Sequence, residues 1–424
     1  MSTTESVRET LWDKFKKFAA TIGPGIFILG YTVGTGSVTT MATSGADYGL
    51  SLSWAVGLSC IFTYILIVSI GRATIVQDQT LITSFKNYFG KPITLFIIVG
   101  LMLTVISSVM GIMGIVSNIV QEWTRIITPA GNGIHPIFTA AFCSGLLYYL
   151  FWNGQHNFFL KAIAVIVAIM SASFIITMII VFSNPQEVLP TFIPSMPTGE
   201  GGHLILAGMV GTTMATVVVV TRTYLVAEQG WTMHDLREEK RDAKISLTMT
   251  FIVSVAIIAA AAGTMFPLGI HVENAIDMVK TLEPLAGQFA TSLFVVGLVA
   301  AGLSSTFPNY VLGPWLVLDY LNLPREMTSR KVRIGVFIVA LTGLIVPVFG
   351  GQPVIIMIAS QAVSPVIMPL LIALTYVLLN TKANVQDYKN PKFLNIGLIV
   401  AFLFSLFISY SAIVGLFDFV SNLG

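Results

Sequence analysis

Long apolar runs make up most of the chain, and short polar connections separate them. Each run is about 20 residues long, the length that a helix needs to cross the hydrocarbon core of a bilayer. The fold class that this pattern predicts is an all-α polytopic membrane protein. It has eleven spans, at residues 20–46, 51–71, 93–118, 136–152, 158–182, 204–229, 245–267, 287–319, 333–349, 354–379 and 395–418.

The connections between the runs are too short to fold by themselves. The longest hydrophilic stretch, 184–203, is rich in proline and glycine and is typical of a loop. Another connection, 229–244, carries a cluster of charged residues and predicts the solvated start of a helix. We therefore expect an N-terminal segment, 1–19, followed by a single transmembrane domain, 20–424.

Lysine and arginine fall on alternate connections, which predicts the orientation of the chain. One side of the membrane receives only Arg125 and Lys280, and Arg222 falls inside a span. The other side receives Arg8, Lys14, Lys16, Lys17, Arg72, Lys86, Lys91, Lys161, Arg237, Lys240, Arg241, Lys244, Arg325, Arg330, Lys331, Arg333, Lys382, Lys389 and Lys392. Positively charged loops stay in the cytoplasm. The N-terminus is therefore predicted to be cytoplasmic and the C-terminus outside, in a plasma (inner) membrane.

Composition narrows the possible functions. With 55% hydrophobic and 10% charged residues, the chain is too apolar for a soluble protein, and a net charge of +2 gives no indication of a nucleic-acid partner. Cys60 and Cys143 both lie in apolar runs, so we expect packing residues and not a disulfide or metal pair. No cluster of histidine, cysteine and carboxylate falls at membrane depth, so neither an enzyme nor a cofactor is expected.

Two of the apolar runs contain a polar, glycine-containing break. The first break is Tyr31–Thr40 and the second is Gly208–Thr216, in the sixth run. Backbone freed from a helix inside a membrane must line a cavity or be buried in protein, whereas a single glycine only allows close helix packing. Runs one and six are corresponding members of two five-helix halves. Paired breaks there predict an inverted-repeat transporter that binds its substrate between them.

Several short motifs resemble those of the Nramp (natural resistance-associated macrophage protein) metal-ion transporters. They are Gly23-Pro24-Gly25, Ser44-Gly45-Ala46-Asp47-Tyr48-Gly49, Ser304-Ser305-Thr306 and Ser360-Gln361-Ala362-Val363 with Pro369. The resemblance covers essentially the whole chain. It implies a LeuT-type fold of two inverted five-helix repeats plus an eleventh span, with the ion held between unwound parts of spans one and six, often with proton coupling.

The resemblance also implies which residues face the substrate. The family's Asp-Pro-Gly-Asn motif falls on 34–37, and its Met-Pro-His motif on 215–217. Gln361 matches a family ligand, and the carbonyls of Tyr31 and Thr212 stand where the family uses carbonyls. The predicted substrate-binding residues are thus Tyr31, Gly34, Thr35, Gly36, Ser37, Thr212, Ala215, Thr216 and Gln361. Ser37 and Gln361 are the candidate metal ligands.

The departures from the family motifs change the expected ion. Gly34 replaces the family's carboxylate and Ala215 replaces its thioether, so the ligands that select transition metals are missing. A harder ion that keeps part of its water, such as Mg²⁺, suits hydroxyl and carbonyl oxygens. The Nramp-related magnesium transporters, an altered branch of the family, set the precedent. We therefore expect Mg²⁺ or a similar ion ahead of Mn²⁺ or Fe²⁺.

Ionisable residues at membrane depth are few. The third span, 92–120, contains none, so a proton relay along it is not expected. Arg222 falls where the family has a second histidine in span six and is a candidate gating or coupling residue. Its alternative role is structural, as a helix-end arginine that snorkels to the membrane surface or pairs with Glu228 or with a neighbouring helix. Carboxylates near the span ends are expected to be solvated, namely Asp47, Asp78 and Asp319.

Two other classes of function remain open at this point. In the first, Gly34-Thr35-Gly36 resembles the glycine-bracketed break of amino-acid carriers, where exposed backbone N–H groups receive a carboxylate. The missing aspartate removes a charge that would repel an anion. Arg222 would attract an anion if that side chain faces the cavity. The second class is a non-transporting membrane protein whose site has degenerated.

Overall fold

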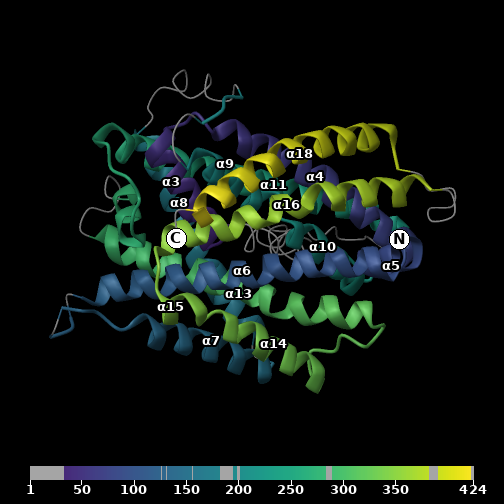
Figure 1. Ribbon diagram of the computed structural model, residues 1–424, viewed down its shortest axis with the longest axis horizontal. Helices are drawn as coiled ribbons and strands as arrows, with labels where there is room; N and C mark the ends of the chain where they lie inside the picture. The colour runs from purple at the N-terminus through teal and green to yellow at the C-terminus, as the bar shows by residue number, and fades with distance from the viewer. Residues whose placement is uncertain are drawn as a thin grey trace, which may run out of the picture.

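All the regular secondary structure in the described part of the chain is helical (Figure 1). The computed structural model describes residues 33–125, 127–129, 131–154, 156–181, 194–197, 201–282, 289–381 and 390–421, without the side chains of 155–160 and 162–164. Helices satisfy their own backbone hydrogen bonds, which is the condition for crossing lipid.

Among the described residues, eight helices are long and apolar enough to cross a membrane, and two shorter apolar ones accompany them. The long ones are α4 (Ser53–Gln77), α6 (Lys91–Thr124), α9 (Gly202–Thr213) with α10 (Thr216–Gln229), α11 (Leu236–Thr264) with the short turns η3 (Met233–Asp235) and η4 (Phe266–Leu268), α13 (Ala290–Tyr320), α14 (Arg330–Thr342) with α15 (Ile345–Phe349), α16 (Pro353–Asn380) and α18 (Lys392–Ser421). The shorter ones lie in α7 (Pro136–Trp152) and α8 (His156–Val181). Together they account for predicted spans two to eleven.

Predicted span one is described only in part. Its second half is α3 (Thr35–Tyr48), whereas residues 20–32, and with them Tyr31, lie outside the described residues. Two short helices, α5 (Leu81–Phe89) and η5 (Ala275–Leu282), lie in connections.

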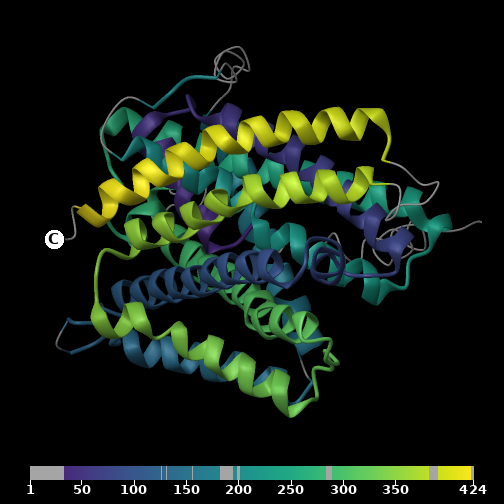
Figure 2. The same ribbon diagram turned by 45° about the vertical axis from the view of Figure 1, so that its right-hand side comes forward.

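The helices pack in a bundle that brings the two interrupted spans together. α16 packs against α6, α9 and α18, while α3 packs against α11 and α9. α13 packs against α6 and α8. α7 and α14 lie side by side along one edge of the bundle in both Figure 1 and Figure 2. Outward-facing side chains of this edge and of α18, such as Phe138, Phe337 and Leu403, are apolar and exposed, as lipid contact requires.

Span six is interrupted as the sequence predicted. α9 ends at Thr213 and α10 begins at Thr216; Met214 and Ala215 between them are not helical, and Ala215 is extended. In span one the chain is extended at Gly34 and helical from Thr35 onward. The non-helical part of the first break therefore ends earlier than the polar pattern indicated, because Thr35–Thr40 form the first turns of α3.

Candidate substrate-binding site

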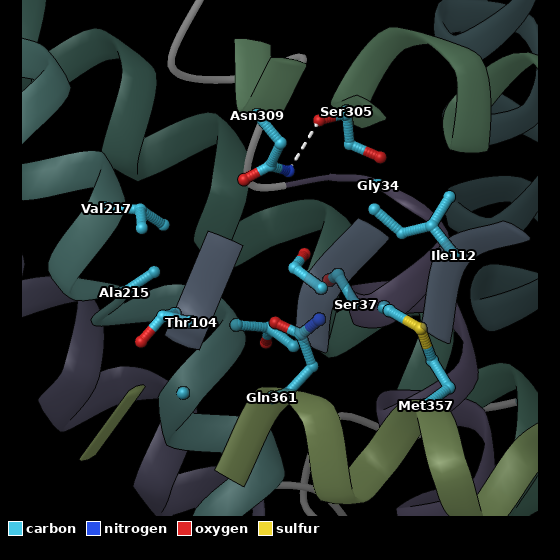
Figure 3. A pocket seen from close by; sticks show the side chains of 14 residues that line it. Gly34, Ser37, Thr104, Ile112, Ala215, Val217, Ser305, Asn309, Met357 and Gln361 are labelled. Carbon is cyan, nitrogen blue, oxygen red and sulfur yellow. Dashed lines mark hydrogen bonds between the residues drawn. The ribbon is translucent and has the colours of Figure 1, made fainter. Parts of the chain in front are cut away.

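Both interruptions open onto one small buried cavity (Figure 3). Its fourteen lining residues are Gly34, Gly36 and Ser37 at the start of α3, Thr104, Ser108 and Ile112 on α6, Gly211, Thr212, Ala215 and Val217 around the span-six break, Ser305 and Asn309 on α13, and Met357 and Gln361 on α16. The cavity volume is about 30 Å³. A water molecule needs about 10–15 Å³ by this measure, so the space suits an ion with one or two waters.

Six of the predicted site residues line this cavity: Gly34, Gly36, Ser37, Thr212, Ala215 and Gln361. Thr35 and Thr216 do not, and their hydroxyls are engaged elsewhere. The Thr35 hydroxyl donates to the carbonyl of Leu298 at 3.1 Å. The Thr216 backbone N–H donates to the Ser364 hydroxyl at 2.8 Å, and the two hydroxyls lie 3.2 Å apart. These two threonines fix the ends of the interrupted helices to α13 and α16.

Glycines allow α3 and α9 to approach α16 closely at the cavity. A Cβ on Gly36 would collide with the Met357 methyl group and lie 2.8 Å from Nε2 of Gln361. A Cβ on Gly211 would collide with the backbone carbonyl of Gln361. Since no side chain other than hydrogen fits at either position, both breaks can sit directly against the candidate ligand Gln361.

The donor groups of the cavity are neutral. Hydroxyls, two amides and one thioether line it, and none of its fourteen described residues is ionisable. The Thr212 hydroxyl donates to the carbonyl of Met209 at 2.9 Å, and Nε2 of Gln361 lies 3.5 Å from the Ser360 hydroxyl. Such donors leave the oxygen lone pairs available to a cation. The described residues contain no group of three or more histidine, cysteine or acidic side chains that could hold a metal.

Ser37 has the least satisfied side chain of the site. It is 2% exposed, and its hydroxyl has no hydrogen-bond partner within the described residues. A buried hydroxyl without a partner costs about 1–3 kcal/mol. The hydroxyls of Thr39, Thr40, Thr43 and Ser44 on α3 also have no partner within the described residues, but of these five only Ser37 lines the cavity. A cation or a water in the cavity would supply the missing partner.

Eight of the fourteen lining residues were not among the predicted site residues, and five of these carry a polar or sulfur-containing side chain. Thr104 and Ser108 are polar positions one turn apart on α6, and so are Ser305 and Asn309 on α13. Met357 lies one turn before Gln361 on the same face of α16. The spacing of four residues is the signal that could have identified them. Met357 also corrects the expectation that the site has no thioether, because α16 supplies one where span six does not.

Arg222 does not line the cavity. It is fully buried, and its guanidinium pairs with Asp242 at 2.5 Å and with Glu239 at 3.1 Å, both on α11. The ring of Trp231 lies 5.5 Å from the guanidinium carbon. Of the structural alternatives, pairing with a neighbouring helix is therefore the correct one, and the fully buried side chain does not snorkel. The pairing with Glu228 is wrong, because two carboxylates of α11 take the guanidinium.

The three carboxylates expected to be solvated differ. Asp78 is exposed at the end of α4, and Asp47 is partly exposed, with its carboxylate 2.8 Å from Nδ1 of His271. Asp319 contradicts the expectation, since it is only 7% exposed and accepts hydrogen bonds from three hydroxyl groups. Its position in the sequence, close to the end of a span, gave no indication of these partners.

Two half-helices that end at a buried polar cavity, inside a bundle of apolar helices, define a multi-pass membrane protein with paired interrupted spans. A sequence model of the natural resistance-associated macrophage protein-like (Nramp) proteins matches residues 25–415. The chain therefore belongs to the Nramp family, as its motifs implied.

Curated relatives and solved structures agree with this assignment. A divalent metal cation transporter, MntH, of Listeria welshimeri is 24% identical over 96% of this chain and 92% of its own length. MntH of Clostridium acetobutylicum is 29% identical over 51% of this chain and 50% of its own length.

Among solved structures, a manganese transporter of Eremococcus coleocola superposes with a TM-score of 0.72 at 15% identity, over 98% of this chain and 90% of that one. A nucleobase-cation-symport-1 family transporter in a closed conformation gives a TM-score of 0.60 at 13% identity, over 93% and 90% of the two chains. These likenesses confirm the predicted LeuT-type fold.

Proposed function

We propose that this protein is a secondary transporter that moves a divalent metal ion by alternating access. Membership of the Nramp family supports the proposal, as do relatives described as divalent metal cation transporters. The observation that carries it is the cavity itself: both interrupted spans and Gln361 converge on a space of about 30 Å³ that offers several oxygen donors. Paired broken helices around a buried site are the arrangement that secondary transporters use.

The ion we propose is Mg²⁺ or a similarly hard divalent ion, ahead of Mn²⁺ and Fe²⁺. The cavity contains hydroxyl and amide oxygens but no carboxylate among its described residues. Mg²⁺ dehydrates reluctantly and accepts neutral oxygen ligands together with retained waters. Ser37 and Gln361 are the side chains that we assign as ligands. Among the described cavity residues, the Met357 thioether is the one soft donor for a transition metal.

One argument for an organic-solute carrier loses its basis here. The guanidinium of Arg222 is paired with Glu239 and Asp242 of α11 and does not line the cavity. Relatives described as divalent metal cation transporters favour transport over a non-transporting protein.

We further propose that transport does not depend on a proton gradient acting along α6, because residues 92–120 contain no ionisable group. The accompanying topology is a cytoplasmic N-terminus, an outside C-terminus and a single transport domain from residue 20 onward, in the plasma membrane.

Isothermal titration of the purified protein with Mg²⁺, Mn²⁺ and a panel of amino acids tests the proposal. We expect saturable binding of Mg²⁺, weaker binding of Mn²⁺ and no response to amino acids. Binding of an amino acid without any response to either metal would show that the protein is an organic-solute carrier. In proteoliposomes, a pH-sensitive dye should report no proton entry with the ion; proton entry with Mg²⁺ would overturn the coupling proposal.

A further inference from the structure

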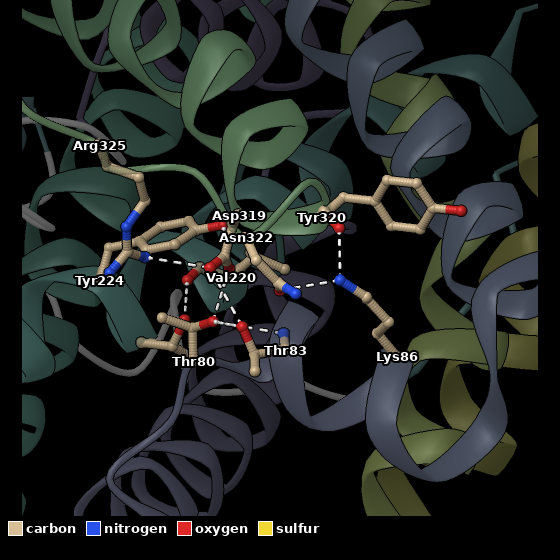
Figure 4. A network of polar contacts seen from close by, with 10 residues as sticks. Thr80, Thr83, Lys86, Val220, Tyr224, Asp319, Tyr320, Asn322 and Arg325 are labelled. Carbon is tan, nitrogen blue, oxygen red and sulfur yellow. Dashed lines mark hydrogen bonds and ion pairs between the residues drawn. The ribbon is translucent and has the colours of Figure 1, made fainter. Parts of the chain in front are cut away.

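Asp319 is the centre of a second buried polar cluster, at the end of the bundle that carries most of the lysines and arginines (Figure 4). Three hydroxyls reach its carboxylate: Thr80 at 2.5 Å, Thr83 at 3.1 Å and Tyr224 at 3.1 Å. The guanidinium of Arg325 lies 3.6 Å from the other side of the carboxylate. We call these five residues the Asp319 latch.

Within the latch, the short helix α5 and the end of α13 are attached to each other. Thr80 caps the N-terminus of α5, where its hydroxyl accepts the backbone N–H of Thr83. The carboxylate of Asp319 thus lies at the positive end of α5, which favours a negative charge. At the other end of the same short helix, Lys86 donates to the carbonyl of Tyr320 at 2.7 Å. α5 is therefore attached to the end of α13 at two points.

Tyr224 is the member of the latch that comes from an interrupted span. It lies on α10, is 1% exposed, and packs edge-on against the ring of Trp315 at 5.6 Å. Arg325 covers its ring, with the guanidinium carbon 4.8 Å from the ring centre. The Tyr224 hydroxyl donates a hydrogen bond to the Asp319 carboxylate, and this bond joins α10 to α13.

The cavity and the latch contact different parts of α10. Ala215 and Val217, at the start of α10, line the cavity, and Tyr224 follows Thr216 by eight residues. At 1.5 Å per residue this separation is about 12 Å along one short helix. A rigid displacement of α10 therefore moves the cavity wall and withdraws Tyr224 from Asp319 together.

Arg222 determines which partner α10 keeps during such a displacement. Its guanidinium, two residues before Tyr224, is bound to Glu239 and Asp242 of α11 with no exposure to solvent. Breaking a buried ion pair costs much more than releasing one neutral hydroxyl from a carboxylate that keeps other donors. These side-chain contacts therefore tie α10 more firmly to α11 than to α13, while most of its packing is against α4.

We infer that the contact between Tyr224 and Asp319 is a releasable gate: it closes the cavity toward the lysine- and arginine-rich end, and the Tyr224 hydroxyl must leave the carboxylate before that side opens. This inference adds a structural device to the proposed transport cycle. It requires no particular ion, so it can be tested without any substrate.

Cysteine accessibility tests the gate directly. In a background with Cys60→Ala and Cys143→Ala, Ser108→Cys places a thiol in the cavity wall on α6. A charged, membrane-impermeant methanethiosulfonate is applied from each face, in sealed vesicles of each orientation. We expect Tyr224→Phe to raise the labelling rate about tenfold from the face that carries the lysine- and arginine-rich end, because one charge-assisted hydrogen bond of the closed state is lost. Labelling from the opposite face should not rise.

Tyr320→Phe is the matched control. This tyrosine is the neighbour of Asp319 in the sequence, and its hydroxyl lies 3.5 Å from the carbonyl of Lys91, outside the latch. The control should label at the rate of the unsubstituted protein from both faces. An unchanged rate in Tyr224→Phe, an equal rise from both faces, or an equal rise in Tyr320→Phe would overturn the inference. Failure of Tyr224→Phe to fold would overturn it too, because the hydroxyl would then be required for the fold itself.

Discussion

The cavity and the charged clusters on α10 are both buried and polar, but they satisfy their polar groups in opposite ways. The described cavity residues are neutral, and the Ser37 hydroxyl there has no partner. In contrast, the guanidinium of Arg222 pairs with two carboxylates, and Asp319 has four partners around it. We infer that the two kinds of polar group have different roles. The buried charges hold helices together, whereas the neutral groups of the cavity bind the transported ion.

Removing the Arg222 charge tests the structural half of this comparison and should have the largest effect. Arg222→Met leaves Glu239 and Asp242 buried without their cation, which costs about 3–5 kcal/mol of stability. Thermal unfolding in detergent measures the loss. Arg125→Met is the control, because Arg125 is 52% exposed in its pair with Glu122 and should lose about 1 kcal/mol at most. Equal losses in the two variants would remove the distinction between buried and surface charges.

Truncating the candidate ligand Gln361 tests whether the neutral groups of the cavity bind the ion. Gln361→Ala removes an amide oxygen from the cavity and should lower affinity for the transported ion by about 10–100-fold, the range found when groups supporting metal sites are lost. Thermal stability should change little. Ion uptake into proteoliposomes and titration report the effect. Gln121→Ala is the control, because it removes the same kind of side chain at a partly exposed position outside the cavity, and this variant should transport normally. If uptake by Gln361→Ala equals that of the unsubstituted protein, the ion binds elsewhere.

The smallest expected effect concerns the thioether. Met357→Leu keeps the volume of the side chain and removes the only soft donor among the described cavity residues. We expect Mn²⁺ affinity to fall by a few-fold, about 1 kcal/mol or less, while Mg²⁺ affinity stays constant. Competition between the two ions in titration measures the ratio. A parallel fall for both ions would assign Met357 to packing and not to ion selection.

The sequence was sufficient for the fold because the fold depends on long patterns. Apolar runs of helical length must be spans in a bilayer, and a cluster of glycine and hydroxyl residues within one predicts an interruption. The interruption at Met214 and Ala215 lies inside the predicted break. The end of the first break was predicted less well, because Thr35–Thr40 are compatible both with a loop and with a buried helix.

The details of the site depended on contacts that no local pattern specifies. Arg222 had Glu228 available six residues away, but tertiary packing brought two carboxylates of α11 closer. Thr35 and Thr216 carry the same hydroxyl as the cavity residues, and only the neighbouring helices decide that they bind Leu298 and Ser364 instead. The resemblance to the family located Gln361, whereas Met357 became visible only when α16 was placed against α3.

The absence of ionisable groups among the described cavity residues has an electrical consequence. A divalent ion in a neutral site crosses the membrane with both of its charges uncompensated, so the membrane potential does work on two net charges in each transport step. Each elementary charge gains about 2.3 kcal/mol per 100 mV. Two charges gain about 4.6 kcal/mol, which corresponds to roughly a two-thousand-fold concentration ratio at 100 mV. For such a carrier, the membrane potential drives accumulation of the ion, and depolarising the membrane would stop it.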